Sequence, residues 1–415
     1  MKRIAIIGGG AAGLAASIAA AGACRAAGRD GAVTVYEMDA RVGRRILVTG
    51  NGRCNFSNTD MAAEGYRNAA FVAGVYEALP PVRVLEWFYD LGLMWSAEAD
   101  GRLLPATGKA STVVDVLRAR MAVLGVEECC NAKVERLMPP AEPGGTWTLA
   151  LADGRFVRAE ALIVAAGGQD GLSFLPDGVP VEPFAAVLGP LKTVTDPIRG
   201  LDGIRVRCRT RLLRAGAEIA AEEGELLFRK YGVSGICIFN LSRFARKGDV
   251  LSVNLLPDLS AEGARSLLAQ RVQDALALRS DATWEDVFRG MVLPQVAEAL
   301  LKAAGAKMAD PASVDSAELA ALATVLQDFR LKVEGIAEPA QCQVHRGGVA
   351  VDAVSATLES VSHPDLFFAG EALDVDGPCG GYNLHWAWSS GILAGTGAAM
   401  GLVGGEGAAQ GGETR

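Results

Sequence analysis

The sequence predicts an α/β protein in which a dinucleotide-binding domain is split by a separate insert domain. The 415 residues exceed what one hydrophobic core usually supports, so more than one folding unit is expected. The N-terminal residues alternate strand, helix and strand around a glycine-rich turn, and the pattern changes near residue 191 and again near residue 340. We therefore expect the first part of the dinucleotide-binding domain at 1–190, the insert at 191–340 and the second part at 341–415.

The N-terminal segment predicts one βαβ unit. The apolar run Lys2–Ile7 indicates a buried strand, the alanine-rich run Leu14–Ala27 a helix, and Ala32–Glu37 a second strand. Between the first strand and the helix lies the spacing GxGxxG, formed by Gly8, Gly10 and Gly13.

Each part of this glycine turn has a predicted task in binding a dinucleotide. Gly8 permits the tight turn, Gly10 lets the backbone approach a diphosphate, and Gly13 allows the helix to pack closely on the strand. Glu37 can accept hydrogen bonds from a ribose, but the unit alone does not separate FAD from NAD. The cofactor-binding residues predicted in this unit are Gly8, Gly10, Ala11, Ala12, Gly13, Glu37 and Met38.

The remaining elements are predicted from their apolar spacing. Within residues 40–190 we expect helices at Pro81–Leu91 and Ala110–Leu124, a hairpin from Gly145–Leu151 and a strand at Phe156–Val164 that ends at Gly167 and Gly168. The insert predicts strands at Ile204–Leu213 and Ala217–Phe228, followed by helices at Ser260–Arg279, Thr283–Phe288 and Ser316–Phe329. After the insert we expect short strands, the last at Leu366–Gly370, and a helix at Trp386–Met400.

Composition and charge exclude several classes of protein. The net charge of −8 argues against a chain that covers DNA or an anionic membrane, although one local basic face remains compatible with it. The eight cysteines contain no CxxC pair and no zinc spacing, which predicts a reducing compartment and no metal site. No apolar run approaches the ~20 residues of a membrane span, so we expect a cytoplasmic protein.

Two further blocks point to the cofactor. GRRILVTGNGRCNFSN at Gly43–Asn58 and FFAGEALDVDGPCGGYNLHWAWSSGILAG at Phe367–Gly395 closely resemble the signature segments of the BaiN/RdsA family of bacterial NAD(P)/FAD-dependent oxidoreductases. The resemblance implies a flavoprotein whose Rossmann-like FAD-binding domain is split around an insert of a β-barrel plus helices. It also implies that the flavin lies between residues 43–55 and 367–384.

The resemblance and the local chemistry together indicate the other cofactor-binding residues. A glycine turn that opens a helix at Gly380 and Gly381 would direct N–H groups at the pyrimidine edge of the flavin. Glu371 or Asp374 is placed to bind the ribityl or diphosphate region, whereas each arginine near Gly43 is as well explained as a solvated surface residue. The predicted set is Arg44, Arg45, Gly50, Asn51, Arg53, Cys54, Asn55, Val134, Ala166, Gly167, Gly370, Glu371, Asp374, Gly380, Gly381, Tyr382, Asn383 and Leu384.

Candidate catalytic residues follow the second block. His385 is the best of the three histidines for a proton donor, with Tyr382 and Asn383 as polar neighbours of substrate or flavin. A histidine at the start of a helix is more often structural. His345 and His363 have no predicted role.

The chain departs from the family pattern in two places. The segment QDGLSFLPDGVPVEPF at Gln169–Phe184 replaces a Ser-Tyr-Pro segment and a glycine-rich helix start. In the insert, Arg229 and Lys230 replace Thr-His, and Ile236 replaces a proline. Both departures concern the side on which the substrate is expected, so the substrate of the relatives does not transfer directly.

Alternating arginines in the insert predict a basic strand face. In a strand, Arg205, Arg207, Arg209 and Arg211 would share one side at ~7 Å spacing, which suits a phosphate backbone. The alternative is a solvated barrel face neutralised by Glu222, Glu223 and Glu225.

The leading functional prediction is that NAD(P)H reduces FAD and that a hydride then passes to a polarised C=C bond. Acceptors within the family include uracil in ribosomal RNA and small unsaturated molecules. No second GxGxxG is present, so NAD(P)H is expected to visit the flavin transiently. The alternatives are a flavin oxidase that converts a small amine and releases hydrogen peroxide, and an RNA-binding or assembly protein that retains FAD.

Overall fold

The computed structural model describes residues 2–29, 31–142, 144–168, 172–305 and 310–404. The chain forms two compact units, one from Met1–Ala185 with Val344–Arg415 and one from Ala186–Gln343. The chain passes between the units at residues 185 and 343, whereas the sequence alone places these borders at 190 and 340. The first border lies within the strand β11 (Val181–Val187). No turn residue therefore marks this border in the sequence.

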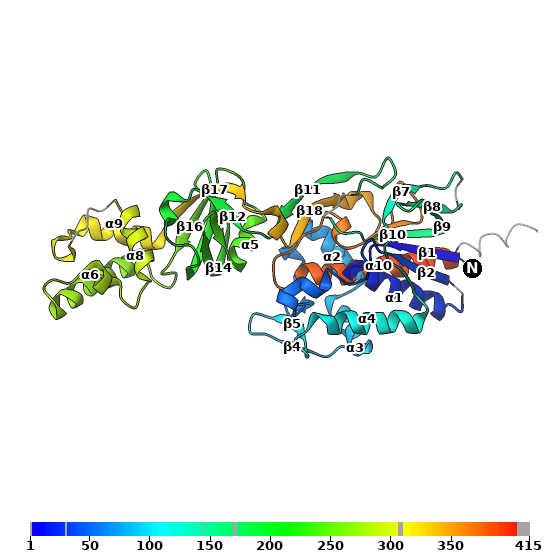
Figure 1. The fold of residues 1–415 in the computed structure, drawn as a ribbon, viewed down its shortest axis with the longest axis horizontal. Coiled ribbons are helices and arrows are strands. Elements are labelled where there is room, and N and C mark those ends of the chain that lie inside the picture. Colours follow the sequence, from blue (N-terminus) through cyan, green and yellow to red (C-terminus); the bar gives the residue numbers. More distant parts are fainter. Residues whose placement is uncertain (1, 30, 143, 169–171, 306–309, 405–415) are drawn as a thin grey trace, which may run out of the picture. The chain divides into compact units, whose positions relative to one another are not determined.

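A five-stranded parallel sheet organises unit 1 (Figure 1). Its order is β19-β10-β1-β2-β6, which places the first strand of the chain at its centre. The glycine turn that follows β1 therefore lies at the carboxyl edge in the middle of the sheet, where ligands of such sheets bind. The strands are β1 (Lys2–Ile7), β2 (Gly31–Tyr36), β6 (Glu127–Cys129), β10 (Ala161–Val164) and β19 (Leu366–Phe368).

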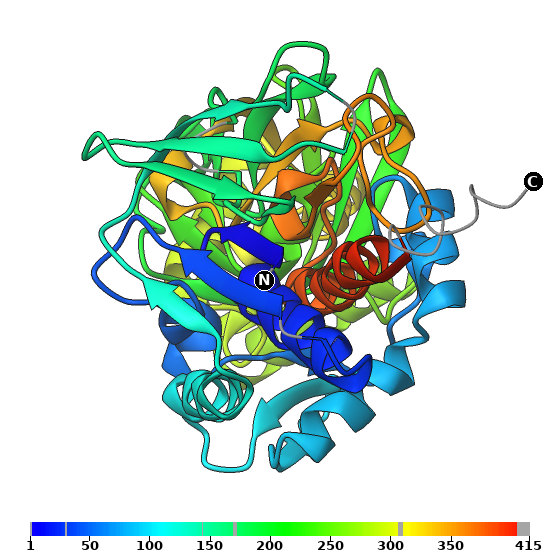
Figure 2. The same cartoon turned by 90° about the vertical axis from the view of Figure 1, so that its right-hand side faces the viewer.

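Two helices from opposite ends of the chain pack closely beside this sheet. Figure 2 shows α1 (Ala11–Ala26) and α10 (Tyr382–Gly404) side by side. A Cβ atom added at Gly391 or Gly395 of α10 would clash with the carbonyl oxygens of Ala12 or Ala16 in α1. Small residues thus let the two backbones touch, with the third turn of α10 beside the first turn of α1.

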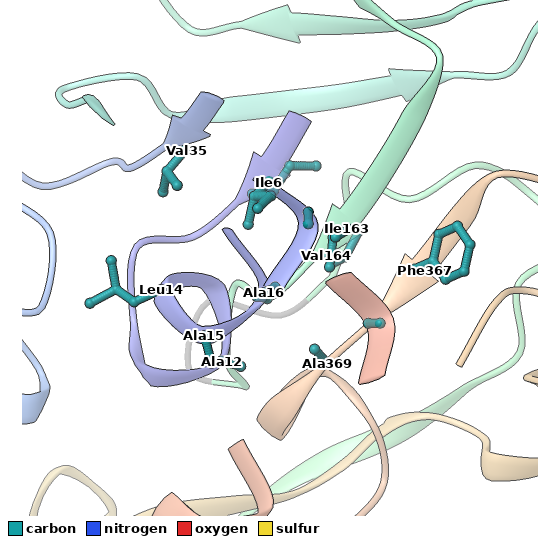
Figure 3. Close-up of a cluster of buried hydrophobic side chains, with 14 of the residues drawn as sticks. Ile6, Ala12, Leu14, Ala15, Ala16, Val35, Ile163, Val164, Phe367 and Ala369 are labelled. Carbon is teal, nitrogen blue, oxygen red and sulfur yellow. The ribbon is translucent and has the colours of Figure 1, made fainter. Parts of the chain in front are cut away.

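The core of unit 1 lies between the sheet and these helices (Figure 3). Ile6, Val35 and Ile163 of three adjacent strands have no exposed surface. Burial of each such side chain contributes about 1.5–3 kcal/mol. The core therefore holds the glycine turn and the start of α1 in a fixed position.

The other elements of unit 1 surround the sheet. The predicted strand Phe156–Val164 is two strands, because β9 pairs with β8 in an antiparallel sheet whereas β10 joins the parallel sheet. The antiparallel sheets have the orders β3-β5-β4 and β7-β8-β9, and β11 pairs with β18. The elements are β3 (Ser57–Asn58), α2 (Ala69–Ala78), α3 (Pro81–Asp90), β4 (Trp95–Ala97), β5 (Arg102–Pro105), α4 (Ala110–Leu124), β7 (Val134–Met138), β8 (Trp147–Leu151), β9 (Phe156–Ala159) and β18 (Val344–Val349).

Unit 2 is a closed six-stranded barrel plus helices, as the family resemblance implied. The strand order is β12-β15-β14-β13-β16-β17, and β17 closes the barrel only after the helices have intervened. Phe329, predicted at the end of a helix, instead begins β17. The strands are β12 (Leu191–Thr193), β13 (Arg205–Arg214), β14 (Ala217–Arg229), β15 (Gly232–Ser234), β16 (Val250–Asn254) and β17 (Phe329–Ile336).

The helices of unit 2 share an apolar core with the barrel. Asp315 begins the last of them with a capping box, in which its side chain accepts hydrogen bonds from two backbone N–H groups. The helices are α5 (Ile236–Ser242), α6 (Ala261–Leu278), α7 (Trp284–Phe288), α8 (Pro294–Ala303) and α9 (Ser316–Gln327). No helix within the described residues has the length and apolar character needed to span a membrane.

Candidate functional site

The glycine turn after β1 forms a cradle at the first turn of α1. Gly8 has a φ of +101°, and a Cβ added there would lie 2.5 Å from the carbonyl oxygen of Ala165. A Cβ added at Gly13 would clash with the carbonyl oxygen of Gly8, whereas one added at Gly10 would meet no atom within 4 Å. Gly8 and Gly13 are thus required by packing, and Gly10 faces open space.

This cradle suits an anion. The residue before α1, Gly10, supplies no side-chain cap, and the first turn of the helix carries no acidic side chain. The N–H groups and the positive end of the helix dipole can therefore serve a diphosphate. The predicted residues Ala11 and Ala12 lie in this first turn.

Glu37 lies beside the cradle and its carboxylate is held in place. Oε2 accepts a hydrogen bond of 2.7 Å from the backbone of Gly9, and Oε1 accepts one of 2.8 Å from the backbone of Asp39. Each oxygen retains a lone pair that a ribose hydroxyl could use. Nearby, Met38 is 45% exposed, and Val134 is buried at the start of β7.

Residues from three distant parts of the chain meet at the first turn of α1. A Cβ added at Gly370, whose φ is +67°, would lie 2.8 Å from Cβ of Ala12. The carbonyl of Gly370 accepts a hydrogen bond of 3.0 Å from the indole of Trp386, so α10 holds this turn in place. Ala166 lies against the other side, since its Cα would be 2.9 Å from a Cβ added at Gly8. Gly167, with a φ of +73°, follows it.

The segment after Gly43 contains a kinked 3-10 turn. Gly50 and Asn51 both have a φ of +55°, and a Cβ on Gly50 would lie 3.0 Å from the side-chain oxygen of Asn55. Cys54 is fully buried, and burial raises the pKa of its thiol to about 11. A protonated, buried thiol fits a packing role for Cys54 and not a reactive one.

The arginines near this turn have acidic partners at the surface. Arg44 pairs with Asp39 at 2.8 Å, and Arg53 pairs with Glu98 at 2.6 Å. Arg45 is exposed. These contacts favour the alternative interpretation of Arg44 and Arg53 as solvated surface residues, with exposed ion pairs of little energetic weight.

The start of α10 contacts the same segment. Gly380 and Gly381 have φ values of +110° and +103°, and a Cβ on Gly381 would clash with the carbonyl oxygen of Ser57. The amide of Asn58 donates a hydrogen bond of 2.9 Å to the carbonyl of Gly380. The two blocks that the family resemblance places around the flavin therefore lie in direct contact. Leu384, in the first turn of α10, is half-buried.

The three predicted catalytic residues differ in how they are placed. Asn383 is bound to the loop before α10, because its amide contacts the backbone of Gly377 and Pro378 at 2.8–3.2 Å. Tyr382 is half-buried, and burial raises the pKa of its phenol. The backbone carbonyl of Tyr382 accepts a hydrogen bond of 2.9 Å from the hydroxyl of Tyr66.

His385 is poorly placed for proton donation. Its side chain has no exposed surface, and Nδ1 lies 2.8 Å from the hydroxyl of Ser57. Burial lowers the pKa of the imidazole to about 3, so the ring is neutral at physiological pH. This geometry supports the structural interpretation of His385, in which it fixes the first turn of α10 to β3.

Asp374 is occupied by other groups. Its side chain is 4% exposed and accepts hydrogen bonds of 2.8 and 2.9 Å from Arg67, and one of 3.0 Å from the backbone of Gly347. The carboxylate therefore holds the loop together. Of the two acids predicted to bind the ribityl or diphosphate region, Glu371 is the more exposed, at 29%.

A row of contacts along β18 could not be predicted from the sequence. Three consecutive residues of this strand each bind a different carboxylate of the segment 371–376. His345 binds Glu371, Arg346 forms a two-pronged pair with the fully buried Asp376 at 2.9 and 3.1 Å, and Gly347 binds Asp374. Glu371 and the two aspartates of the following ALDVD were visible in the sequence, but their partners were not.

The basic strand face of the insert is partly neutralised. Arg205 pairs with Glu225, and Arg207 lies 3.5 Å from Glu223 on the adjacent strand β14. Arg211 donates a hydrogen bond of 3.0 Å to Ser252, and Arg209 is exposed. The alternative of a solvated, neutralised barrel face is therefore favoured for Arg205 and Arg207, which are two of the four arginines.

Comparison with known proteins assigns relatives to the whole chain. The family model described as HI0933-like protein Rossmann domain matches residues 2–397. A 3-dehydro-bile acid delta(4,6)-reductase from Clostridium scindens is 32% identical over 96% of this chain and 99% of its own length. A ribosomal RNA dihydrouridine synthase from Escherichia coli is 29% identical over 93% of this chain and 95% of its own.

Among solved structures, a 3-ketosteroid-delta4-(5alpha)-dehydrogenase from Rhodococcus jostii is similar over 96% of this chain and 97% of its own. Its sequence identity to this chain is 17% and the TM-score is 0.44.

Proposed function

The chain belongs to the HI0933-like family, the BaiN/RdsA family of FAD-binding oxidoreductases, and on this premise we propose that it is an NAD(P)H-dependent reductase of C=C bonds. When bound, FAD supplies the two-electron chemistry by which a hydride passes from NAD(P)H to an acceptor. The proposed acceptor is a C=C bond conjugated with a carbonyl group, in a small molecule or in uracil of ribosomal RNA.

One observation carries this proposal. The first turn of α1 and the second turn of α10 meet at Gly370, and a Cβ at Gly10 would face open space. An uncapped helix start that faces open space fits the diphosphate, and Glu37 fits the adenosine ribose. The residues present thus fit the diphosphate and the adenosine ribose of FAD.

The start of α10 supports hydride transfer from a flavin. Gly380 and Gly381 direct the backbone into a helix start that can stabilise negative charge on the pyrimidine edge of the reduced ring. His385 holds this helix start through its hydrogen bond to Ser57, and Asn383 holds it through its hydrogen bond to the backbone of Gly377. Their proposed task is therefore to position the helix.

The acceptor class rests on the relatives. The names of the bile acid reductase and of the dihydrouridine synthase both describe the reduction of a C=C bond next to a carbonyl group. Arg205 and Arg207 have acidic partners, so their charge is partly neutralised and does not by itself favour RNA. The proposal therefore keeps both acceptors. Unit 2 also contains equal numbers of basic and acidic residues, so the net charge of −8 resides in unit 1.

Turnover under anaerobic conditions tests this proposal. The purified holoenzyme is given NADPH with either a bile acid 4,6-dien-3-one or an unmodified ribosomal RNA transcript. The mass of the product is then measured by mass spectrometry. A gain of two hydrogens in one acceptor supports the reductase and selects the substrate. If neither acceptor changes while a small amine yields hydrogen peroxide in air, the protein is an oxidase.

A further inference from the structure

His345 and Glu371 form a hydrogen-bonded pair at the candidate site. Nδ1 of His345 lies 3.0 Å from Oε1 of Glu371, and the backbone N–H of His345 donates to the same oxygen at 2.9 Å. Both side chains are partly accessible, at 21% and 29% exposure. A carboxylate that receives two donors from one residue holds that residue in a single orientation.

The pair fixes the tautomer of the imidazole. Glu371 accepts hydrogen bonds as a carboxylate, so Nδ1 carries the proton that points at it. The other ring nitrogen, Nε2, lies on the far side of the ring from Glu371, where it can transfer a proton. A carboxylate that orients an imidazole in this way is a recurring part of acid–base pairs.

The pair lies next to the predicted flavin segments. Glu371 follows Gly370, which packs on the first turn of α1. A Cβ added at Gly168 would lie 2.9 Å from Oε1 of Glu371, 2.9 Å from the ring of Phe184 and 3.0 Å from Cβ of His345. Gly168 follows Gly167 in the turn after β10. Phe184 ends the segment that departs from the family pattern, of which residues 169–171 lie outside the described part.

His345 differs from His385 in each property that a proton donor needs. His385 has no exposed surface, whereas His345 is partly exposed and has a carboxylate partner. The sequence alone assigned the role to His385 because it follows the glycine turn. The structure places His345 beside Glu371 through the strand that returns from the insert, a contact between residues 26 positions apart.

We propose that His345, oriented by Glu371, donates the proton that follows the hydride to the acceptor. This inference rests on the proposed reductase function. The hydride forms a C–H bond at one carbon of the C=C bond, and the imidazolium Nε2 delivers a proton to the other carbon as the π bond breaks. The acceptor gains two electrons and two hydrogens, the flavin is oxidised, and the neutral imidazole takes a new proton from water.

His345→Asn is the sharpest variant for the test. The amide nitrogen of asparagine can occupy the position of Nδ1 and keep the bond to Glu371, but asparagine has no counterpart of Nε2. His363→Asn is the matched control, because His363 is a partly exposed histidine of the same unit that bonds to Ser362. His345→Ala provides a cavity into which free imidazole can be added.

The experiment separates the two half-reactions by anaerobic stopped-flow with NADPH and the dienone or the RNA transcript. In H345N we expect flavin reduction within about twofold of wild type and reoxidation by the acceptor about 100-fold slower, the usual range for loss of a general acid. Free imidazole should restore part of the rate in H345A, and H363N should behave as wild type. Equal reoxidation rates in H345N and wild type would overturn the inference and leave the reductase standing.

A second readout does not depend on turnover. The chain has three histidines, so ¹⁵N-labelled histidine gives few signals, and H345N assigns the one of interest. We expect Nδ1 of His345 to remain protonated while Nε2 exchanges its proton, and Glu371→Gln to abolish this preference. A neutral ring protonated on Nε2 would contradict the proposal. A wild-type protein whose flavin no acceptor reoxidises would overturn both the inference and the reductase.

Discussion

Nδ1 of His385 lies 2.8 Å from the hydroxyl of Ser57, and this bond joins the first turn of α10 to β3. The two residues come from the two blocks that surround the proposed flavin site. The contact therefore ties the pieces of the split domain together at the point where the cofactor is expected. Its energetic effect depends on pH, because the imidazole is buried in its neutral form.

The first prediction concerns that pH dependence. An unfolded histidine takes up a proton near pH 6.5, whereas His385 in the folded protein stays neutral down to about 3. The stabilisation is complete above pH 6.5 and is lost as the pH falls, at up to about 1.4 kcal/mol per pH unit. In His385→Asn, the free energy of unfolding should fall less between pH 7.5 and 5 than in wild type, as measured with urea. Parallel curves would contradict the burial of a neutral ring.

The second prediction separates cofactor binding from folding in the glycine turn. Gly10→Val adds a side chain to open space, so the apoprotein should melt within about 2 °C of wild type while FAD affinity falls at least ~100-fold, or about 2.7 kcal/mol. Gly13→Val should fail to fold, because its side chain would clash with the carbonyl of Gly8. Fluorescence titration with FAD and thermal melting check both variants. Tight FAD binding by Gly10→Val would show that the diphosphate lies elsewhere.

The third prediction concerns the ion pair of β18. Arg346→Met removes a partner of Asp376, whose side chain is fully buried, and should lower the free energy of unfolding by about 3–5 kcal/mol. Adding Asp376→Asn should recover at least about 1 kcal/mol, since the buried charge is then gone. Urea denaturation of Arg346→Met, Asp376→Asn and the double variant measures the coupling. A loss below about 1 kcal/mol in Arg346→Met would mean that solvent reaches the carboxylate.

The fourth prediction concerns Cys54. Because burial raises the pKa of its thiol to about 11, iodoacetamide at pH 8 should not modify it in the native protein. Cys129, which is half-buried, serves as the internal comparison in the same peptide map. Both cysteines should react after unfolding in urea. Rapid native modification of Cys54 would indicate that the segment after Gly43 opens.

Much of the cofactor cradle could be predicted from the sequence because its signals are local. Gly8, Gly10 and Gly13 lie within one turn, and the apolar runs on both sides define their strand and helix. The family resemblance added the two blocks at Gly43 and Phe367, and the family is confirmed by the match over residues 2–397. The roles of individual site residues remain predictions.

The contacts that local signals do not encode were missed. The pairing of His345 with Glu371 depends on where the chain returns from the insert, so neither residue carries a sign of the other. The closure of the barrel by β17 depends in the same way on a strand that follows four helices. The place of His385 after a glycine turn predicts a proton donor, but its ring is fully buried and contacts Tyr76 of α2 and Ser57 of β3, which the spacing alone does not show.

The most direct test of the proposed function is the visible spectrum of the holoenzyme without oxygen. Addition of NADPH should bleach the flavin band near about 450 nm, and subsequent addition of the dienone or the RNA transcript should restore it. A protein that binds no FAD, or a bound flavin that NADPH leaves unchanged, would contradict an NAD(P)H-dependent reductase.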